Sequence, residues 1–516
     1  MDIRNILPFL SQKKPVVDSV EEEVVSSKNE TEREFKNDND AIERIPENSS
    51  KRQSETKAGD VSDSSAGVET GEFDKYSEKK SKFSPVIIIA PLLLIVLGGL
   101  VYLGLRFVGQ DGIISTKRGE LTWWGLGIEE DIMKPLIEEY QEIHPNVKII
   151  YINQSPQDYR ERLRNTMVQE KAPDIFRFHN SWVPMFLSDL DTLPSGVMTV
   201  EEYAKTFYPV IVSDMSSGSG FLGIPLEYDA LTLYVNEDIF AQAARTPPTT
   251  WDDFLELAIT LTQKEQQRII IQSGASLGIT DNVDHWPEIL ALMMIQNGVD
   301  LSNPTGKLAV DAVTYYSSFS FQEKIWDNTL PPSTVSFSQG KVAMYIAPTW
   351  RADEIRQLNP SLRFRTVPIP QIRKNVPNAP NITYAIYWAE GVWNKSPNKD
   401  LAWDFLKFLS QKESLEKLNR GMEEKGSFGM VYPRVDMNEI QANDSIFGSV
   451  VTLAPDAKSW FLASNTYDGE TGINSQLSEL FKEVVAIANT RNRQVEAALN
   501  TAAKGISNIL SQYQAR

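Results

Sequence analysis

The sequence predicts an α/β protein of two globular units, preceded by a tail and one membrane-spanning helix. At 516 residues the chain is longer than one ordinary domain requires. Strand and helix patterns alternate from Gly119 to the C-terminus, an order that is typical of α/β folds. An uncharged apolar run at residues 86–105 comes before them and has the length of a membrane span.

Residues 1–83 are predicted to be a disordered, acidic tail. From about Pro15 to Phe83 they consist mainly of Glu, Lys, Ser, Asn and Asp, with few aromatic residues. Such a composition cannot bury enough apolar surface to offset the entropy lost on ordering. The more apolar start at residues 3–10 either docks on a membrane or partner, or has no structure of its own.

Residues 84–108 are predicted to form a transmembrane helix that acts as an uncleaved signal anchor. Lys79, Lys80 and Lys82 flank its N-terminal side, which favours a cytoplasmic tail. A cleaved signal peptide is not expected, because its charged N-terminal region would be about 80 residues long. We therefore expect a single-pass protein in the cell membrane, with a linker at residues 109–118 and the rest of the chain outside the cytoplasm.

The composition excludes several classes of function. A formal net charge of -18 argues against nucleic acid as a partner, because such binding requires clustered Lys and Arg. The chain has no cysteine, which excludes disulfides, thiolate nucleophiles, cysteine-ligated zinc and a lipid-modified cysteine anchor. With only 3 histidines in the chain, no metal site is expected, and no cofactor is predicted.

The first globular unit begins with alternating strands and helices. Apolar strands are predicted at residues 120–124, 147–152 and 173–178. Helices at 128–144 and 159–170 lie between them. Repeated strand–helix–strand units imply a parallel sheet, and ligands bind beyond the carboxyl ends of its strands. The loops at these ends are residues 125–129, 153–158 and 179–182.

The same order recurs later in the chain. A strand at residues 223–226 leads to another at 231–235, after which Asn236 begins a helix. Thr250 is the predicted N-cap of a further helix, whose acidic first turn suits the helix dipole. The sequence therefore indicates a second α/β unit.

Four stretches carry a resemblance to a known family. They are LTWWG with EEYQEIHPNVKI and APDIF; GIPLEYDALTLYVNEDIFAQAARTPPTTWDDFLELA; FSQGKVAMYIAPTW; and GVWN with SPNKDLAWDFLKFLSQKESLEKL. In this order they resemble the extracellular solute-binding proteins of ABC importers, in the cluster related to maltose-binding protein.

The resemblance implies a two-lobed clamp of the periplasmic-binding-protein (Venus-flytrap) type, with the ligand in the cleft between the lobes. The implied lobes are residues 119–228 with about 390–433, and 229–389 with about 434–516. The implied crossings between lobes lie near 227–230, near 384–391 and after Pro433. A monomeric ectodomain of this kind would capture a small solute, a carbohydrate by the resemblance, and deliver it to an ABC permease.

A sugar site requires flat aromatic rings for C–H faces and buried polar groups for hydroxyls. Trp123 and Trp124 are adjacent on a strand, so their rings point to opposite faces, and Trp124 is the one expected in the cleft. Asp229, at the first implied crossing, is preferred to Glu227, which strand alternation turns away. The resemblance implies roles for the loop at 179–182, for Asp229, for the loop at 281–286 and for Trp350. The full set of candidate ligand-binding residues is Trp124, His179, Asn180, Trp182, Asp229, Asp281, Asn282, His285, Trp350, Tyr387 and Trp388.

Several of these assignments have structural alternatives. Trp182 could pack in the core, and Asp284 in the loop before Trp286 could be a simple helix cap. Tyr387 and Trp388 are bulkier than the glycine-rich stretch of many relatives, which predicts a smaller cleft. Residues 467–474 form either a late binding loop or a plain surface loop.

Other functions are weighed against solute import. A glycoside hydrolase would need two carboxylates set across a bond, and no catalytic motif supports an enzyme. Cation binding through Tyr315 and Tyr316 is disfavoured, because the pair lies in an apolar helical stretch. A tethered receptor that senses or retains its ligand without import is the main alternative.

Overall fold

The computed structural model of the protein describes residues 117–513, apart from 219, 267 and 374–378. The predicted tail at 1–83, the predicted transmembrane helix at 84–108 and nearly all of the linker at 109–118 lie outside the described residues. Within the described part, no helix is both long and apolar enough to cross a bilayer. The described residues belong to one compact unit.

Strands and helices alternate along the described chain, as the hydrophobic periodicity predicts. The strands are β1 (Gly119–Leu126), β2 (Val147–Gln154), β3 (Ile175–His179), β4 (Ile224–Pro225), β5 (Leu231–Asn236), β6 (Gln263–Glu265), β7 (Ile269–Ala275), β8 (Val342–Pro348), β9 (Phe364–Val367) and β10 (Trp388–Val392). The helices up to the middle of the chain are α2 (Glu130–Ile143), α3 (Tyr159–Val168), η2 (Asn180–Trp182), α4 (Val183–Phe186), α5 (Val200–Thr206), α6 (Pro209–Asp214), α7 (Glu237–Gln242), α8 (Trp251–Leu261), α9 (Trp286–Gln296) and α10 (Gly306–Phe321). The later helices are α11 (Ser333–Ser338), α12 (Arg351–Leu358), α13 (Lys399–Leu409), α14 (Lys412–Glu424), η3 (Val435–Met437), α15 (Asn438–Gln441), α16 (Gly448–Leu453), η4 (Ala454–Asp456), α17 (Ile473–Ala488) and α18 (Val495–Gln512).

The first sheet has the strand order β2-β1-β3-β10-β4. β1 runs parallel to β2 and β3, which confirms the predicted parallel arrangement of these three strands. β10 runs antiparallel to both β3 and β4, which the strand–helix pattern does not predict. The reason is that β10 enters this sheet from the second sheet and not through a helical crossover. We call this sheet with its helices the first lobe.

The second sheet has the order β6-β7-β8-β5-β9 and forms, with its helices, the second lobe. β5 and β8 are buried along their whole length, as expected for central strands that are covered on both faces. β7 is parallel to β8, whereas β5 is antiparallel to β8 and to β9. The second sheet is therefore mixed, like the first, whereas the sequence predicts for this unit only that strands and helices alternate.

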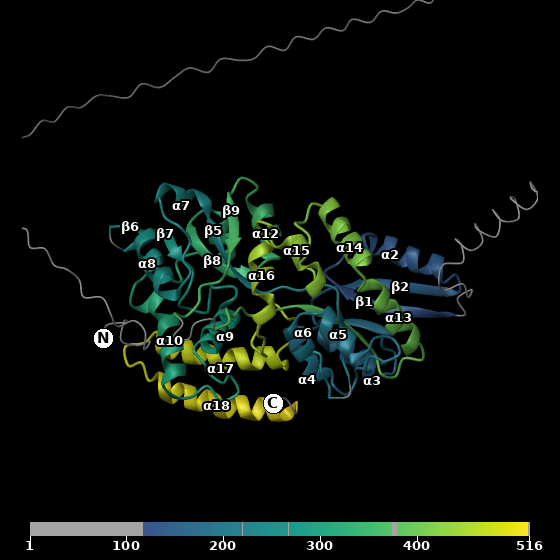
Figure 1. Cartoon of the computed structure of the whole chain (residues 1–516). Helices are drawn as coiled ribbons and strands as arrows, with labels where there is room; N and C mark the ends of the chain where they lie inside the picture. The colour runs from purple at the N-terminus through teal and green to yellow at the C-terminus, as the bar shows by residue number, and fades with distance from the viewer. Residues whose placement is uncertain (1–116, 219, 267, 374–378, 514–516) are drawn as a thin grey trace, which may run out of the picture. The chain divides into compact units, whose positions relative to one another are not determined.

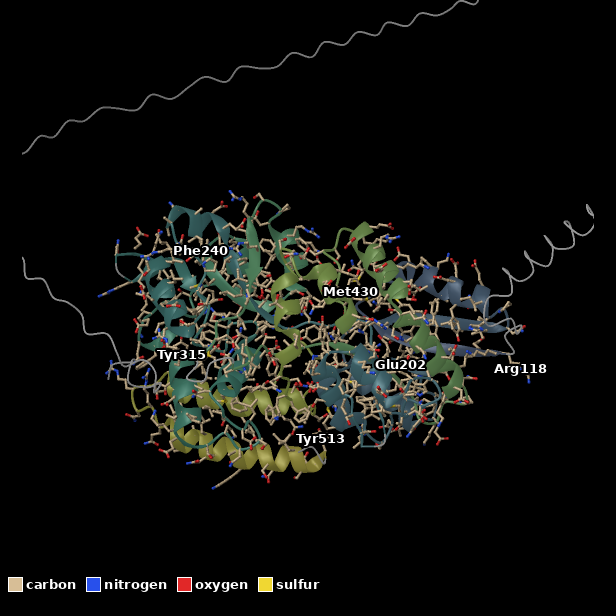
Figure 2. The ribbon with its side chains drawn as sticks, viewed as in Figure 1. Arg118, Glu202, Phe240, Tyr315, Met430 and Tyr513 are labelled. Carbon is tan, nitrogen blue, oxygen red and sulfur yellow. The ribbon has the colours of Figure 1, made fainter. Side chains whose placement is uncertain are left out.

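The chain passes between the two sheets more than once. It leaves the first sheet after β4 and returns to it at β10, and after α14 it reaches α16, which packs on β9 and β5. The crossing segments bond to one another: Tyr228 N donates to Val431 O (2.9 Å) and Ile386 N donates to Asp229 O (2.8 Å). Met430, labelled in Figure 2, lies between the side chains of the two lobes.

The C-terminal helices α17 and α18 pack on each other and on α10 of the second lobe, and lie side by side in Figure 1 (yellow). The start of α17 also contacts the first lobe, where Asn474 Nδ2 donates to Ser181 Oγ at 2.7 Å. Arg160 of α3 donates to Thr471 in the same region. These contacts connect the lobes on the side of the C-terminal helices.

Candidate functional site: a cleft at the lobe crossings

A cavity of about 330 Å³ lies where the crossing segments meet, and residues of both sheets line it. His179 reaches it from the end of β3 in the first lobe, and Pro348 from the end of β8 in the second. The crossing segments contribute Asp229, Ile386 and Val431. The cavity is therefore a cleft between the lobes, at strand ends, where α/β proteins bind ligands.

Five of the sequence-predicted site residues line this cleft: His179, Asp229, His285, Trp350 and Trp388. They come from β3, the first crossing, the start of α9, the end of β8 and the start of β10. The fold thus brings together residues that are more than 200 positions apart in the sequence.

The other predicted residues lie outside the lining of the cleft. Trp124 is half-buried, while Trp123 on the opposite face is 1% exposed, which confirms the predicted alternation. Trp182 has no exposed surface and packs against Tyr159 and Phe186, the core position given above as its alternative.

Asn180 and Tyr387 are engaged by a carboxylate away from the cleft lining. Asn180 Nδ2 donates to Asp214 Oδ2 at 3.0 Å, and Tyr387 Oη donates to the same oxygen at 2.8 Å. Ser459 Oγ donates to Asp214 Oδ1 at 2.5 Å. These residues therefore bind the first lobe to the crossing segments.

Asp281 and Asn282 have local partners in the second lobe. Asn282 Oδ1 accepts from Trp326 Nε1 at 2.7 Å, and its amide donates to the carbonyl oxygens of Asp327 and Leu330. Asp281 Oδ2 accepts from Asn328 Nδ2 at 3.1 Å. The geometry gives both residues a role in fixing this loop.

Aromatic rings border the cleft at Trp350, which follows β8 of the second sheet, and at Trp388, which begins β10 of the first sheet. Trp350 is 43% exposed, and the Arg351 guanidinium carbon lies 4.2 Å from its ring centroid. Tyr467 is 44% exposed and stacks on Trp388, with centroids 6.4 Å apart and an angle of 25° between the rings. Both aromatic surfaces suit the apolar face of a flat ligand.

Asp229 lines the cleft, but its oxygens are occupied by the backbone. Oδ1 accepts from Ala230 N (2.7 Å) and Thr349 N (2.9 Å), and Oδ2 accepts from Trp350 N (3.1 Å). Burial raises the pKa of Asp229 to about 7, against the opposing effect of these donors. Asp229 therefore positions Trp350 at the end of β8.

His179 presents a hydrogen-bond donor at the cleft. Ser181 N donates to His179 Nδ1 at 3.3 Å, so the ring proton lies on Nε2. Nε2 is buried and has no hydrogen-bond partner among the described residues. Burial lowers the pKa of His179 to about 3, so the ring is neutral at physiological pH.

The sequence prediction omits a buried ionic cluster at the cleft. Arg177 of β3 pairs with Glu227 and lies 3.4 Å from Glu390 Oε1, while Trp123 Nε1 donates to Glu390 Oε2 at 2.8 Å. Glu227 lines the cleft, so the expectation that it faces away is wrong. A charged Arg177 within the apolar strand Ile175–His179 was the available signal, because buried charges require partners.

Three cleft residues from α9 and a late segment are also missing from the prediction, namely Glu288, Ser464 and Asn465, whereas Tyr467 belongs to the segment given as a possible binding loop. Asn465 and Tyr467 have positive φ angles of 56° and 55°. The polar composition of residues 467–474 was the sequence feature that pointed to this part of the chain. The position of Tyr467 in the cleft lining favours the binding-loop alternative over a plain surface loop.

A sequence profile shows the family of the chain. The profile of the bacterial extracellular solute-binding proteins matches residues 135–423, more than half of the chain. A relative from Brucella abortus (strain 2308), named as a binding protein, is 23% identical over 274 residues. The match covers 50% of this chain and 62% of the relative, so the chain spans less than two thirds of that relative's length.

Solved structures share the fold at low identity. The sugar-binding protein MalE of Xanthomonas citri aligns with a TM-score of 0.62 and 17% identity, over 77% of this chain and 98% of that one. A cyclic alpha-maltosyl-1,6-maltose binding protein of Arthrobacter globiformis aligns with a TM-score of 0.61 and 18% identity, over 77% of this chain and 100% of that one.

An ABC transporter solute-binding protein of Thermotoga lettingae, bound to alpha-D-tagatose, aligns with a TM-score of 0.59 and 20% identity, over 76% of this chain and 100% of that one. These neighbours have the two-lobed α/β fold described above. The chain belongs to the bacterial extracellular solute-binding proteins, a family of binding proteins and not of enzymes.

Proposed function

We propose that the protein binds a saccharide in the cleft and holds it between the two lobes. The observation that carries the proposal is the pair of exposed aromatic surfaces, Trp350 on one side and Trp388 with Tyr467 on the other. Aromatic faces cover the C–H faces of sugars, and the buried polar atoms around them suit hydroxyl groups. His179 Nε2 and Tyr228 Oη are such atoms without partners among the described residues.

The structural neighbours support a saccharide as the ligand class. Their ligands include alpha-D-tagatose, mannobiose and maltotetraose. A cavity of about 330 Å³ is near the lower end of the usual range for ligand sites, which favours a mono- or disaccharide over a long oligosaccharide.

The cleft carboxylates support binding without hydrolysis. A glycosidase needs an acid and a second carboxylate free to act on the bond between two sugars. Here Glu227 pairs with Arg177, and Asp229 accepts three backbone hydrogen bonds. Their engagement in the fold suits a role in shaping the site.

The role in transport is part of the same proposal. We infer that residues 84–108 anchor the chain in the cell membrane, that the tail is cytoplasmic, and that the clamp lies outside and delivers its solute to an ABC permease. The family supports the extracytoplasmic location, and the proposed lobes are residues 119–228 with about 390–433 and 229–389 with about 434–516.

Protease treatment of intact cells tests the proposed orientation. We expect the tail at residues 1–83 to survive and the part after residue 118 to be cleaved, because only the latter is exposed outside the cell. Lysed cells, in which both parts are accessible, are the control. Loss of the tail in intact cells would reverse the orientation.

A thermal-shift screen of the full-length protein tests the proposed ligand class. Mannobiose, maltotetraose and tagatose are compared with amino acids and divalent cations. A saccharide at about one hundred times its Kd should stabilise the fold by roughly 2.7 kcal/mol, because it binds only the folded state. Shifts with amino acids or cations, and none with saccharides, would contradict the proposal.

A further inference from the structure

Glu288 is a buried carboxylate at the wall of the cleft. It lies in the first turn of α9 and has 0% exposed surface, yet it borders the cavity together with His285, Ser464 and Tyr467. A carboxylate in such a position requires hydrogen-bond donors on both oxygens, because an unsatisfied buried acceptor costs about 1–3 kcal/mol.

Only one oxygen of Glu288 has donors in the structure. Oε1 accepts from Ser464 N at 2.6 Å and from Ser464 Oγ at 2.7 Å. Oε2 is buried and accepts no hydrogen bond from any described residue. The carboxylate of this cleft-lining residue therefore has an acceptor position left over.

The neighbouring histidine does not fill this position. Arg351 Nε donates to His285 Nε2 at 2.9 Å, so His285 carries its proton on Nδ1 and is neutral in this arrangement. That Nδ1 lies 3.5 Å from Glu288 Oε1, the oxygen that already has donors. Arg351 itself pairs with Glu354.

The other carboxylates of the cleft have their partners. Glu227 pairs with Arg177, and Asp229 accepts three backbone N–H groups. Asp353 accepts from Ser427 Oγ at 2.6 Å and from Phe428 N at 2.8 Å. Among these four cleft carboxylates, Glu288 alone has a buried oxygen without a donor from the described residues.

We propose that Glu288 is a specificity-determining residue, and that its Oε2 accepts a hydrogen bond from a donor group of the bound saccharide. The donor is a hydroxyl of a neutral sugar or the ammonium of an amino sugar, since a carboxylate accepts from both. The inference rests on the proposed saccharide site. It adds that the ligand presents a donor group to Glu288, in the same cavity that Tyr467 lines.

The substitution Glu288→Gln in the full-length protein tests the inference. The amide oxygen can still accept from Ser464, but its NH₂ group replaces Oε2, so a donor then faces the donor of the ligand. We expect titration calorimetry to show a Kd raised about tenfold or more for the saccharide that the wild type binds. The melting temperature of the ligand-free protein should change little, because both Ser464 contacts are kept.

Glu479→Gln is the matched control, because it makes the same change on an exposed face of α17. Its Kd should equal that of the wild type. Mannobiose and an unacetylated glucosamine disaccharide serve as the neutral and the cationic probe. Tighter binding of mannobiose assigns a hydroxyl donor to Oε2, and tighter binding of the amine assigns an ammonium.

Two results would overturn the inference. The first is a Glu288→Gln variant that binds the same saccharide as tightly as the wild type, which would leave the saccharide site itself intact. The second is a crystal structure of the wild-type complex in which no ligand oxygen or nitrogen lies within about 3.2 Å of Oε2. The second measurement does not depend on the folding of the variant. Absence of any saccharide binding by the wild type would instead refute the proposed function.

Discussion

At the scale of single residues, buried carboxylates at and beside the cleft are fixed in place by hydrogen-bond donors. Arg177 contacts both Glu227 and Glu390, and Trp123 donates to Glu390. Burial raises the pKa of Glu390 to about 7, although Arg177 and Trp123 oppose the shift. The cluster therefore fixes the geometry of the cleft at some cost in stability near neutral pH.

This cost predicts a pH dependence of stability. The pKa of Glu390 in the fold, about 7, lies above its ordinary value of 4.5, so the folded protein binds more protons than the unfolded chain between these values. The contribution of Glu390 to stability is therefore complete below about pH 4.5 and is lost as the pH rises through 7. Asp229, whose pKa is also raised to about 7, acts in the same direction.

Glu390→Gln isolates the effect, because glutamine does not titrate. The unfolding free energy of the variant minus that of the wild type should increase by on the order of 2 kcal/mol from pH 5 to pH 8. Urea unfolding at several pH values measures this difference, and Glu479→Gln is the exposed control. A difference between variant and wild type that is independent of pH would contradict the prediction.

At the scale of elements, local sequence patterns were sufficient for β1, β2 and β3, for the helices α2 and α3 between them, and for the start of α8 in the second lobe. The apolar spacing at residues 128–144 becomes α2, with Met133, Leu136 and Tyr140 buried. Thr250 caps α8 by accepting from Asp253 N, as the N-cap pattern predicts. Apolar spacing and N-cap residues act within a few positions of the chain, so the sequence alone is sufficient to place these helices.

The direction of a strand and the exposure of a side chain depend on tertiary packing instead. β10 is antiparallel because it returns from the second sheet, which no local pattern records. Alternation placed Trp123 and Trp124 on opposite faces, but it could not show that neither ring lines the cleft. The same limit applies to Asp229. No local pattern shows that its carboxylate accepts hydrogen bonds from Thr349 and Trp350, which are 120 and 121 positions away in the sequence.

At the scale of the whole molecule, the cleft exists because the chain crosses between the lobes repeatedly. The crossing segments bond to one another through Tyr228 with Val431, and through Asp229 with Ile386. Asn474 and Ser181 add a contact between α17 and the first lobe. We therefore expect a ligand in the cleft to contact residues of both lobes, and each lobe to contribute to binding.

Titration calorimetry of the full-length protein with Trp350→Ala and Trp388→Ala tests this expectation most directly. The ligand is the saccharide that stabilises the wild type most in the thermal-shift screen. Each variant should raise the Kd about tenfold or more, because each removes an aromatic surface of the cleft. Trp124→Ala is the matched control, since Trp124 lies outside the cleft lining, and its Kd should stay within about twofold of the wild type. Wild-type affinity in both cleft variants would contradict a saccharide site between the lobes.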